Sequence, residues 1–489
     1  MKNTTFRTAE QKNGEGQDTI AKLLELEKES AVFDYTVKDI PVWLFIRSLL
    51  PDYINRGTFH TPRQMITLKE KLRIAFPYLR TRMSGFMKIW KLFTAKRWFL
   101  TGVTTRSYFP GYGYVDVYFD LLLDHSAQKN DIILELPTFT GSLHKKDNYK
   151  PERVVFGDFL YFLELFVRYN PNTNDRYTLK KVAEIGVYIF EKLTGKREEG
   201  LYRLFYNEMF QQIRRYNVFR LLFFLCRPAK IVLLSSYSST CILLTHHARL
   251  RGVETIEFQH AHIYPQHIGY RYDSVAQESL VKLPRPHKFI VFGPYYKELL
   301  MRQSWLEDSI MVVGNPNIET YRILNKFQDS GVLTDITKCF KYVIIVVSQH
   351  TTIETFIDFL RDAGKHDDCL FIIKIHPRGS GEKEAYEKSL NVSKNIIFSP
   401  PGLSLWNLFQ HANAAIGAYS TGLLDALSFG IPAFCLQSSF SAYFADLIDS
   451  GYMVYVQTID EMKTQLEQSR TMKVMSLYNP LSFDMIDSI

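Results

Sequence analysis

Short apolar runs alternate with helix-compatible stretches along most of the chain, in two series separated by the turn Gly314-Asn315-Pro316. Such runs are typical of buried strands joined by helical crossovers into a parallel sheet, so two series predict two such sheets. The strands are expected at 131–136, 230–234, 255–258, 288–292 and 310–313, and then at 342–347, 371–375, 414–418 and 431–436. Helices are expected near 353–363 and 422–429 in the second series.

The N-terminal part of the chain follows a different pattern. Residues 1–18 are polar and predict a disordered tail, whereas residues 19–98 have helical periodicity. Later in this region apolar residues recur every three or four positions, and Pro77 is expected to interrupt the helix. They are Leu68, Leu72, Phe76, Leu79, Met83, Phe86, Trp90 and Phe93. The predicted units are the tail 1–18, a helical basic region 19–98, an N-terminal α/β domain 99–315, and a C-terminal α/β domain with a tail, 316–489.

The net charge of +8 is concentrated in front of the first α/β domain. Between Arg63 and Arg97 lie ten basic residues and one acid, Glu70. The segment is either a helical hairpin with a solvated basic face or a helix on an anionic membrane surface, anchored by Trp90 and Trp98. The second interpretation predicts membrane binding by Lys88, Trp90, Lys91, Lys96, Arg97 and Trp98. Nucleic-acid binding has no support from a recognised RNA- or DNA-binding motif.

Composition and missing motifs narrow the class of protein. The chain has 489 residues, of which 46% are hydrophobic and 22% charged, as expected for a folded protein of two domains. Five dispersed cysteines indicate reduced core thiols and a cytoplasmic location. We expect no signal peptide and no membrane-spanning helix. The sequence lacks GxxxxGK[ST], a strand-linked GxGxxG, HExxH and GxSxG, which argues against common ATPases, dehydrogenases and hydrolases.

In parallel sheets ligands bind beyond the carboxyl ends of the strands, so the polar residues that follow predicted strands are candidates for a site. Lys374, His376 and Arg378 stand in Lys-Ile-His-Pro-Arg, at the end of the strand 371–375. An imidazole and a guanidinium there are suited to bind a phosphate group. The alternative is a histidine that only satisfies loop carbonyls.

A second candidate phosphate site follows the strand 414–418. Ser420 and Thr421 precede a predicted helix, and hydroxyls with free backbone N–H groups at a helix start form an anion site. Asp425 lies one turn further on and is suited to accept hydrogen bonds from ribose hydroxyls. The alternative is an ordinary helix cap with an acidic first turn.

Polar residues also follow strands of the first series. Glu257 and His260 are candidates for a general base that deprotonates an acceptor hydroxyl. Ser235, Ser236 and His262 are candidates for binding an acceptor or a diphosphate, although the serines are equally suited to cap a helix. The neighbouring histidines lack a fourth ligand at a familiar spacing, so we expect no metal.

These motifs resemble those of bacterial capsule transferases: polysialyltransferases, capsule Kdo transferases and teichoic-acid glycerophosphate polymerases. The resemblance rests on residues 374–378, on Ser-Thr-Gly at 420–422 with Asp425, and on the turn 313–316. Gln259-His260-Ala261 is similar to another element of the group, with alanine where glycine is usual. Residues 99–101 through 118–120 are similar to the first strand and loop of capsule-biosynthesis proteins.

The resemblance implies a GT-B fold, with two Rossmann-like parallel-sheet domains facing a cleft and an N-terminal helical extension. It implies that His376, Ser420 and Thr421 contact the donor phosphate. Asp425 would bind the ribose, where related enzymes usually carry glutamate. His260 would be the catalytic base, although Ala261 weakens that assignment because alanine resists backbone geometry that glycine permits.

The expected activity is metal-independent transfer of a sugar from a CMP- or other nucleotide-activated donor, with no cofactor. The expected acceptor is a growing, lipid-linked capsule or lipopolysaccharide glycan. The enzyme is expected to lie peripherally on the inner face of the cell membrane, with other capsule-assembly proteins as further partners and no nucleic acid. Three alternatives stay open: a polyol-phosphate transferase on the same fold, a non-catalytic polysaccharide- or lipid-binding export protein, and a nucleotide-sugar epimerase.

Overall fold

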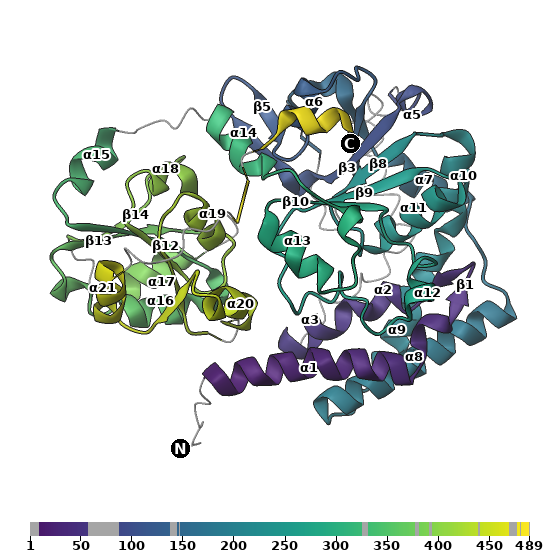
Figure 1. Cartoon of the computed structure of the whole chain (residues 1–489), viewed down its shortest axis with the longest axis horizontal. Helices are drawn as coiled ribbons and strands as arrows, with labels where there is room; N and C mark the ends of the chain where they lie inside the picture. Colours follow the sequence, from purple (N-terminus) through teal and green to yellow (C-terminus); the bar gives the residue numbers. More distant parts are fainter. Residues whose placement is uncertain are drawn as a thin grey trace.

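The computed structural model describes two α/β lobes that lie side by side (Figure 1). The described residues are 9–56, 88–136, 144–145, 147–324, 331–376, 381–390, 394–438, 441–468, 477–479 and 481–488. None of the helices within these ranges combines the length and the apolar character needed to cross a membrane. All five cysteines are unpaired, and only Cys339 is exposed.

The N-terminal domain is built on a seven-stranded sheet in which every pairing is parallel. Its strands are β3 (Arg97–Gly102), β6 (Ile132–Leu136), β7 (Val154–Phe156), β8 (Lys230–Leu233), β9 (Glu254–Phe258), β10 (Lys288–Val291) and β11 (Ile310–Val312). They lie in the order β11-β10-β9-β8-β3-β6-β7, so the chain reverses direction across the sheet between β3 and β8. Most side chains of these strands are buried, because helices cover both faces.

The C-terminal domain repeats this plan with six parallel strands. They are β12 (Tyr342–Val347), β13 (Cys369–Lys374), β14 (Ile396–Phe398), β15 (Ala414–Gly417), β16 (Ala433–Leu436) and β17 (Val454–Val456). Their order is β14-β13-β12-β15-β16-β17, the Rossmann order with its reversal between β12 and β15. The prediction of a GT-B-type fold with two parallel-sheet α/β domains is confirmed.

Helices fill the crossovers between these strands. In the N-terminal domain they are α6 (Asp120–His125), α7 (Phe159–Phe166), α8 (Thr173–Thr194), α9 (Leu201–Arg214), α10 (Tyr216–Leu225), α11 (Ser239–Leu250), α12 (Gln277–Leu280) and α13 (Pro294–Met301). In the C-terminal domain they are α16 (Ile353–Leu360), α17 (Glu382–Ser389), α18 (Leu405–Phe409), α19 (Gly422–Ser428) and α20 (Ala445–Asp449), whereas α15 (Gly331–Thr337) precedes β12 and α21 (Ile459–Gln468) follows β17. An antiparallel hairpin, β4 (Arg106–Phe109) and β5 (Gly113–Asp116), follows β3.

The N-terminal extension packs along the first lobe and consists of α1 (Ala9–Glu29), the short strands β1 (Thr36–Val37) and β2 (Ile40–Pro41), and the helices α2 (Leu44–Arg47) and α3 (Leu49–Arg56). Glu27 fixes α1 to α2 through a buried ion pair, because its Oε1 accepts a hydrogen bond of 2.6 Å from Arg47 Nε. The expectation of a disordered tail over 1–18 is wrong from Ala9 onwards, since 9–18 form the first half of α1. Six of these ten residues are Glu, Gln, Lys or Ala, which favour helices even without an apolar face, although Gly14 and Gly16 disfavour them.

Two later segments return to the N-terminal domain. Helix α14 (Pro316–Leu324) packs there, with Thr320 Oγ1 donating to the Val117 carbonyl at 3.1 Å. The last described residues lie beside α6 (Figure 1), where Arg97 Nη1 donates to the Ile486 carbonyl at 2.9 Å. The two lobes are therefore joined by the chain in both directions.

Candidate functional site

The segment after β13 carries the first predicted phosphate contacts. Lys374 ends the strand and donates from Nζ to the Leu403 carbonyl at 2.5 Å, and burial lowers the pKa of its ammonium group. His376 follows and is exposed. Arg378 lies outside the described residues. Lys374 therefore holds the neighbouring loop in place, while His376 is accessible to a ligand.

The start of α19 carries the second predicted contacts, directly after β15. Ser420 Oγ accepts a hydrogen bond of 3.3 Å from the Gly422 backbone N–H, and Thr421 is exposed. A Cβ at Gly422 would lie 2.6 Å from Leu405 Cδ2 and 3.0 Å from Val347 Cγ1. The helix start therefore packs tightly against β12 and α18, and a larger residue at position 422 would displace the Leu405 side chain.

Asp425, one turn into α19, is half-buried at the junction of the two domains. Its carboxylate accepts no hydrogen bond from the described residues, and burial raises its pKa to about 7. Burial raises the pKa of four tyrosines, and the charge of Asp425 adds to that effect. They are Tyr118 and Tyr296 of the N-terminal domain, Tyr321 of α14, and Tyr478 of the C-terminal segment. A titratable group with a perturbed pKa between two domains is typical of a functional site.

The residues that follow β12, at the reversal point of the C-terminal sheet, were not among the predicted site residues. Ser348 Oγ donates to Glu382 Oε2 at 2.9 Å and also contacts the Tyr386 hydroxyl at 2.9 Å. Gln349 Oε1 accepts from the Tyr419 backbone N–H at 3.4 Å, which links this loop to the one before α19. The sequence does indicate these residues, because Ser-Gln-His directly follows a strongly apolar run, the same pattern that identifies the other candidates.

Glu257 lies on β9 and is fully buried. Its Oε2 accepts a hydrogen bond of 2.7 Å from the Ser236 backbone N–H, and its Oε1 accepts one of 2.7 Å from the Tyr270 hydroxyl. Burial raises the pKa of its carboxyl group to about 7. With both oxygens bonded inside the domain, Glu257 is placed to hold the loop after β8 rather than to reach a substrate.

His260 is the partly accessible histidine at the end of β9. Its Nε2 lies 3.4 Å from Ser235 Oγ, and Nδ1 is buried without a hydrogen-bond partner among the described residues. Burial lowers its pKa to about 4, so the imidazole is neutral at pH 7. Tyr118 donates from its hydroxyl to the His260 carbonyl at 2.5 Å. Tyr118 thus contacts the backbone of His260, and the charge of Asp425 adds to burial in raising the pKa of its hydroxyl.

His262 lies deeper in the domain junction and is buried. Its Nδ1 is 3.3 Å from the Tyr296 hydroxyl, and its ring centroid is 5.2 Å from that of Tyr443, in the C-terminal domain. Burial lowers its pKa to about 3. These contacts make His262 part of the packing between the domains, although it was predicted to bind an acceptor or diphosphate.

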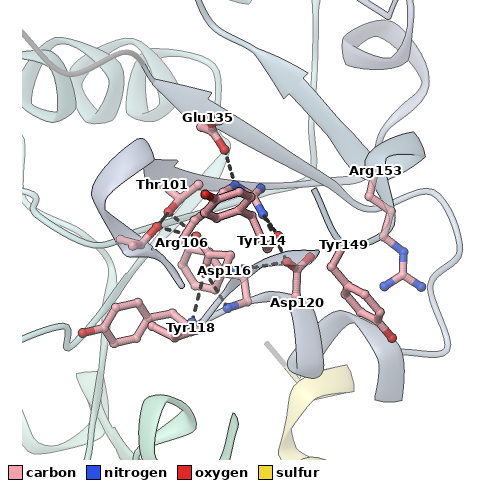
Figure 2. Close-up of polar contacts among 12 residues, drawn as sticks. Thr101, Arg106, Tyr114, Asp116, Tyr118, Asp120, Glu135, Tyr149 and Arg153 are labelled. Carbon is pink, nitrogen blue, oxygen red and sulfur yellow. Dashed lines mark hydrogen bonds and ion pairs between the residues drawn. The ribbon is translucent and has the colours of Figure 1, made fainter. Parts of the chain in front are cut away.

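A buried ionic network beneath the β4–β5 hairpin fixes Tyr118 (Figure 2). Arg106 pairs with Glu135 through Nε and with Asp120 Oδ2 through Nη1 at 3.2 Å. Asp116 Oδ1 accepts from the backbone N–H of Tyr118 at 3.1 Å, and Asp116 Oδ2 accepts from Thr101 Oγ1 at 2.5 Å. The network therefore sets the course of the backbone at Tyr118. The sequence feature that indicates this network is Glu135, a carboxylate within an otherwise apolar strand.

His144 extends this network and bridges two acids. Its Nδ1 contacts Glu135, and its Nε2 lies 2.6 Å from Asp158 Oδ2. Although burial acts against it, hydrogen bonds to both acids raise the pKa of His144. Burial also raises the pKa of Asp120 to about 7, against the influence of Arg106.

The predicted membrane-binding residues divide into two groups. Trp90 and Lys96 are exposed, and Lys88 and Lys91 are partly exposed, with Nζ donating to the carbonyls of Pro151 and Glu152 at 2.5 Å. The prediction is wrong for Arg97 and Trp98, which are buried in β3. Arg97 Nη2 lies 2.6 Å from Asp131 Oδ2. The helical pattern thus ends before Arg97, and the stripe from Leu68 to Phe86 lies outside the described residues.

Comparison with known proteins gives no family assignment. No family model matches the chain, and no curated protein matches it. The described residues contain no group of three or more His, Cys, Asp or Glu side chains placed to hold a metal ion.

Solved structures similar to the chain include a UDP co-structure, a UDP-GlcNAc 2-epimerase and a glycosyltransferase. The S. aureus MnaA–UDP co-structure is 13% identical, with a TM-score of 0.46 over 80% of this chain and 94% of the other. UDP-GlcNAc 2-epimerase from Neisseria meningitidis bound to UDP-GlcNAc is 12% identical, with a TM-score of 0.45 over 80% and 97%. The glycosyltransferase SnogD from Streptomyces nogalater is 10% identical, with a TM-score of 0.39 over 81% and 94%.

Proposed function

We propose that the chain is a transferase that moves a sugar from a nucleotide-activated donor, of CMP or another base, to a glycan acceptor. The observation that carries the proposal is the position of Tyr118, which contacts His260 in one domain and is influenced by Asp425 in the other. A residue that follows β9 and a carboxylate one turn into α19 thus act on the same side chain. A donor held by one sheet and an acceptor held by the other would have their reacting groups there.

In this proposal the donor lies on the C-terminal domain. His376 and the Ser420–Thr421 helix start would bind the phosphate groups, and Asp425 would accept hydrogen bonds from the ribose hydroxyls. His376 and the Ser420–Thr421 helix start would also stabilise the negative charge that develops on the leaving phosphate. No step in this scheme requires a metal ion.

His260 is the proposed general base. Its neutral imidazole would take the proton of the acceptor hydroxyl as that oxygen attacks the anomeric carbon and the bond to the donor phosphate breaks. Ser235, 3.4 Å from Nε2, is placed to orient the ring or the acceptor. In this proposal the acceptor is a capsule or lipopolysaccharide glycan. The enzyme would act in the cytoplasm, at the inner membrane surface.

The test is a thermal-shift screen of the full chain against CMP, CDP, UDP and GDP. A nucleotide at a hundred times its dissociation constant adds about 2.7 kcal/mol to the stability of a folded protein, which is readily measured. The variants His376→Ala, Ser420→Ala and Asp425→Asn should each reduce the shift. His366→Ala is the matched control, because His366 precedes β13 at the opposite end of the same strand.

The pH dependence of binding provides a second readout. A carboxylate with a pKa of about 7 loses its charge as the pH falls below 7, so nucleotide affinity should fall between pH 8 and pH 6. Asp425→Asn should remove this dependence. A chain that binds none of the four nucleotides, or variants that all bind like the wild type, would overturn the donor site.

A further inference from the structure

The strongly exposed apolar side chains of this protein are not scattered. Among the described residues, and apart from tyrosines, those more than half exposed are Trp90 (58%), Phe93 (53%), Phe166 (71%), Phe224 (64%), Leu250 (60%), Val281 (67%) and Leu306 (62%). All but Phe166 lie shortly before a strand of the seven-stranded sheet. Trp90 and Phe93 precede β3, Phe224 precedes β8, Leu250 β9, Val281 β10 and Leu306 β11.

Sheet topology brings these positions to one edge, which we call the amino edge and define by those six residues. The strands β11, β10, β9, β8 and β3 are successive neighbours in the sheet, and all are parallel. Neighbouring strands are about 4.8 Å apart, so the segments that enter these five strands span roughly 20 Å. The Ala229 backbone N–H donates to the Lys96 carbonyl at 2.7 Å, which ties two of the segments together. In Figure 1, α5 (Lys91–Thr94) and α10 both lie on the side of the lobe away from the C-terminal domain.

The charges on this edge have one sign over most of its length. The segments 95–96, 226–229, 251–253 and 281–287 lead into β3, β8, β9 and β10 and contain five basic residues and no acid. Of these, Lys96, Arg227, Arg251 and Lys282 are exposed. The nearby Glu254 is neutralised by Lys288 at 2.9 Å and Lys230 at 3.5 Å. Only the segment before β11 carries acids, Glu307 and Asp308.

We propose that the amino edge docks on a bilayer that contains anionic phospholipid. Apolar side chains that project beyond a row of cations are suited to the boundary between headgroups and acyl chains, where both interactions are satisfied together. Isolated exposed apolar residues are normal on proteins, whereas six that precede neighbouring strands at one sheet edge point to an interaction surface. Aliphatic residues such as Leu250, Val281 and Leu306 do not suit a nucleic acid, which binds cations and stacking rings. This inference goes beyond the proposed transferase activity and does not depend on it.

The experiment is co-sedimentation of the full chain with vesicles of phosphatidylcholine alone or mixed with phosphatidylglycerol. We expect binding to the mixed vesicles, little binding to phosphatidylcholine, and weaker binding as salt screens the cations. Each cation near such a surface strengthens binding roughly fivefold. The triple variant Lys96→Glu, Arg227→Glu, Arg251→Glu should therefore lower the partition constant on the order of a hundredfold.

The charge control is the triple variant Lys338→Glu, Arg361→Glu, Lys365→Glu. These cations of the C-terminal domain have side chains 70%, 68% and 74% exposed, and their reversal changes the net charge equally. It should bind vesicles nearly as the wild type does at physiological salt. Equal losses in the two triple variants would reduce the effect to net charge and overturn the proposal.

A second pair of variants isolates the apolar contribution. Phe224→Ser with Leu250→Ser should weaken vesicle binding without a change of charge, whereas Tyr177→Ser, at a tyrosine 65% exposed on α8, should not. The melting temperatures of all variants show whether each has folded. Failure of the folded wild type to bind the mixed vesicles would overturn the proposal. A wild-type dimer that Phe224→Ser with Leu250→Ser converts to a monomer would also overturn it and assign the edge to contact between copies.

Discussion

The substitution Glu257→Gln should change the stability of the protein in opposite directions at low and at high pH. Glu257 is fully buried, and burial raises the pKa of its carboxyl group from an ordinary 4.5 to about 7. Between pH 4.5 and pH 7 the carboxyl group of Glu257 is therefore ionised in the unfolded chain and protonated in the folded chain. The group's contribution to stability is therefore complete below pH 4.5 and is lost as the pH rises to 7.

The size of the effect follows from this shift and from two hydrogen bonds. Between pH 5 and pH 8 the wild type should lose about 2.5 kcal/mol that a glutamine variant does not lose. Glutamine has one carbonyl oxygen, so it cannot accept from both the Ser236 N–H and the Tyr270 hydroxyl, and a buried donor without its acceptor costs about 2 kcal/mol. The variant should thus be about 1 kcal/mol less stable than the wild type at pH 5 and about 1 kcal/mol more stable at pH 8.

The assay is the melting temperature of both proteins, measured in steps from pH 5 to pH 8. A difference of 1 kcal/mol corresponds to about 3 °C for a domain of this size, so the two curves should cross. Other titrating groups act equally in both proteins and cancel in the difference. A difference in melting temperature that stays constant over this range would refute the reasoning.

Glu254→Gln is the matched control for that experiment. Glu254 begins the same strand, and, although burial acts to raise it, ion pairs with Lys288 and Lys230 lower the pKa of its carboxyl group. Its contribution is present above pH 4.5 and is lost only as the pH falls through the lowered folded pKa. From pH 5 to pH 8 the difference between Glu254→Gln and the wild type should therefore stay flat.

Two further predictions concern the base and the ionic network. His260→Ala should keep nucleotide binding and lower turnover by about 10² to 10⁴, the usual contribution of a general base, whereas loss of turnover in Glu257→Gln but not in His260→Ala would move the base to Glu257. Arg106→Met should lower stability by about 3 to 5 kcal/mol, because Glu135 and Asp120 lose their buried cation, and a melting temperature like that of the exposed-site variant Arg302→Met would contradict this.

The elements that the sequence predicted are those buried on both faces. A strand in the middle of a parallel sheet has an uninterrupted apolar sequence. For this reason the predicted bounds of β12, Tyr342–Val347, agree with the structure at both ends. The strands β7, β14 and β17 were missed, and each has three residues; β11 is equally short, but the turn Gly314-Asn315-Pro316 follows its apolar run and marks its end. The β4–β5 hairpin was missed although Gly111 and Gly113 mark its turn with φ of 81° and 78°.

Some residues of the candidate site could likewise be predicted from the sequence, and others could not. Residues that directly follow a strand, such as Ser235, His260 and Ser420, could be identified because the carboxyl ends of parallel strands share one edge. The tyrosines around Asp425 could not, since they come from segments that only the folded chain brings together. Arg97 and Trp98 were misassigned because a basic, aromatic composition outweighed the apolar run that they begin.

The two proposals together constrain the acceptor. The amino edge and His260 lie at opposite ends of the same strands, since Leu250 precedes β9 and His260 follows it. Five extended residues measure about 17 Å, and the loops at both ends add to that distance. With the amino edge on the bilayer, a hydroxyl that reaches His260 must lie well above the headgroups. A sugar attached directly to its lipid is too short for this, whereas the end of a glycan several sugars long reaches it. Membrane docking and transfer at His260 are therefore compatible for an enzyme that extends a chain, rather than one that adds its first residue.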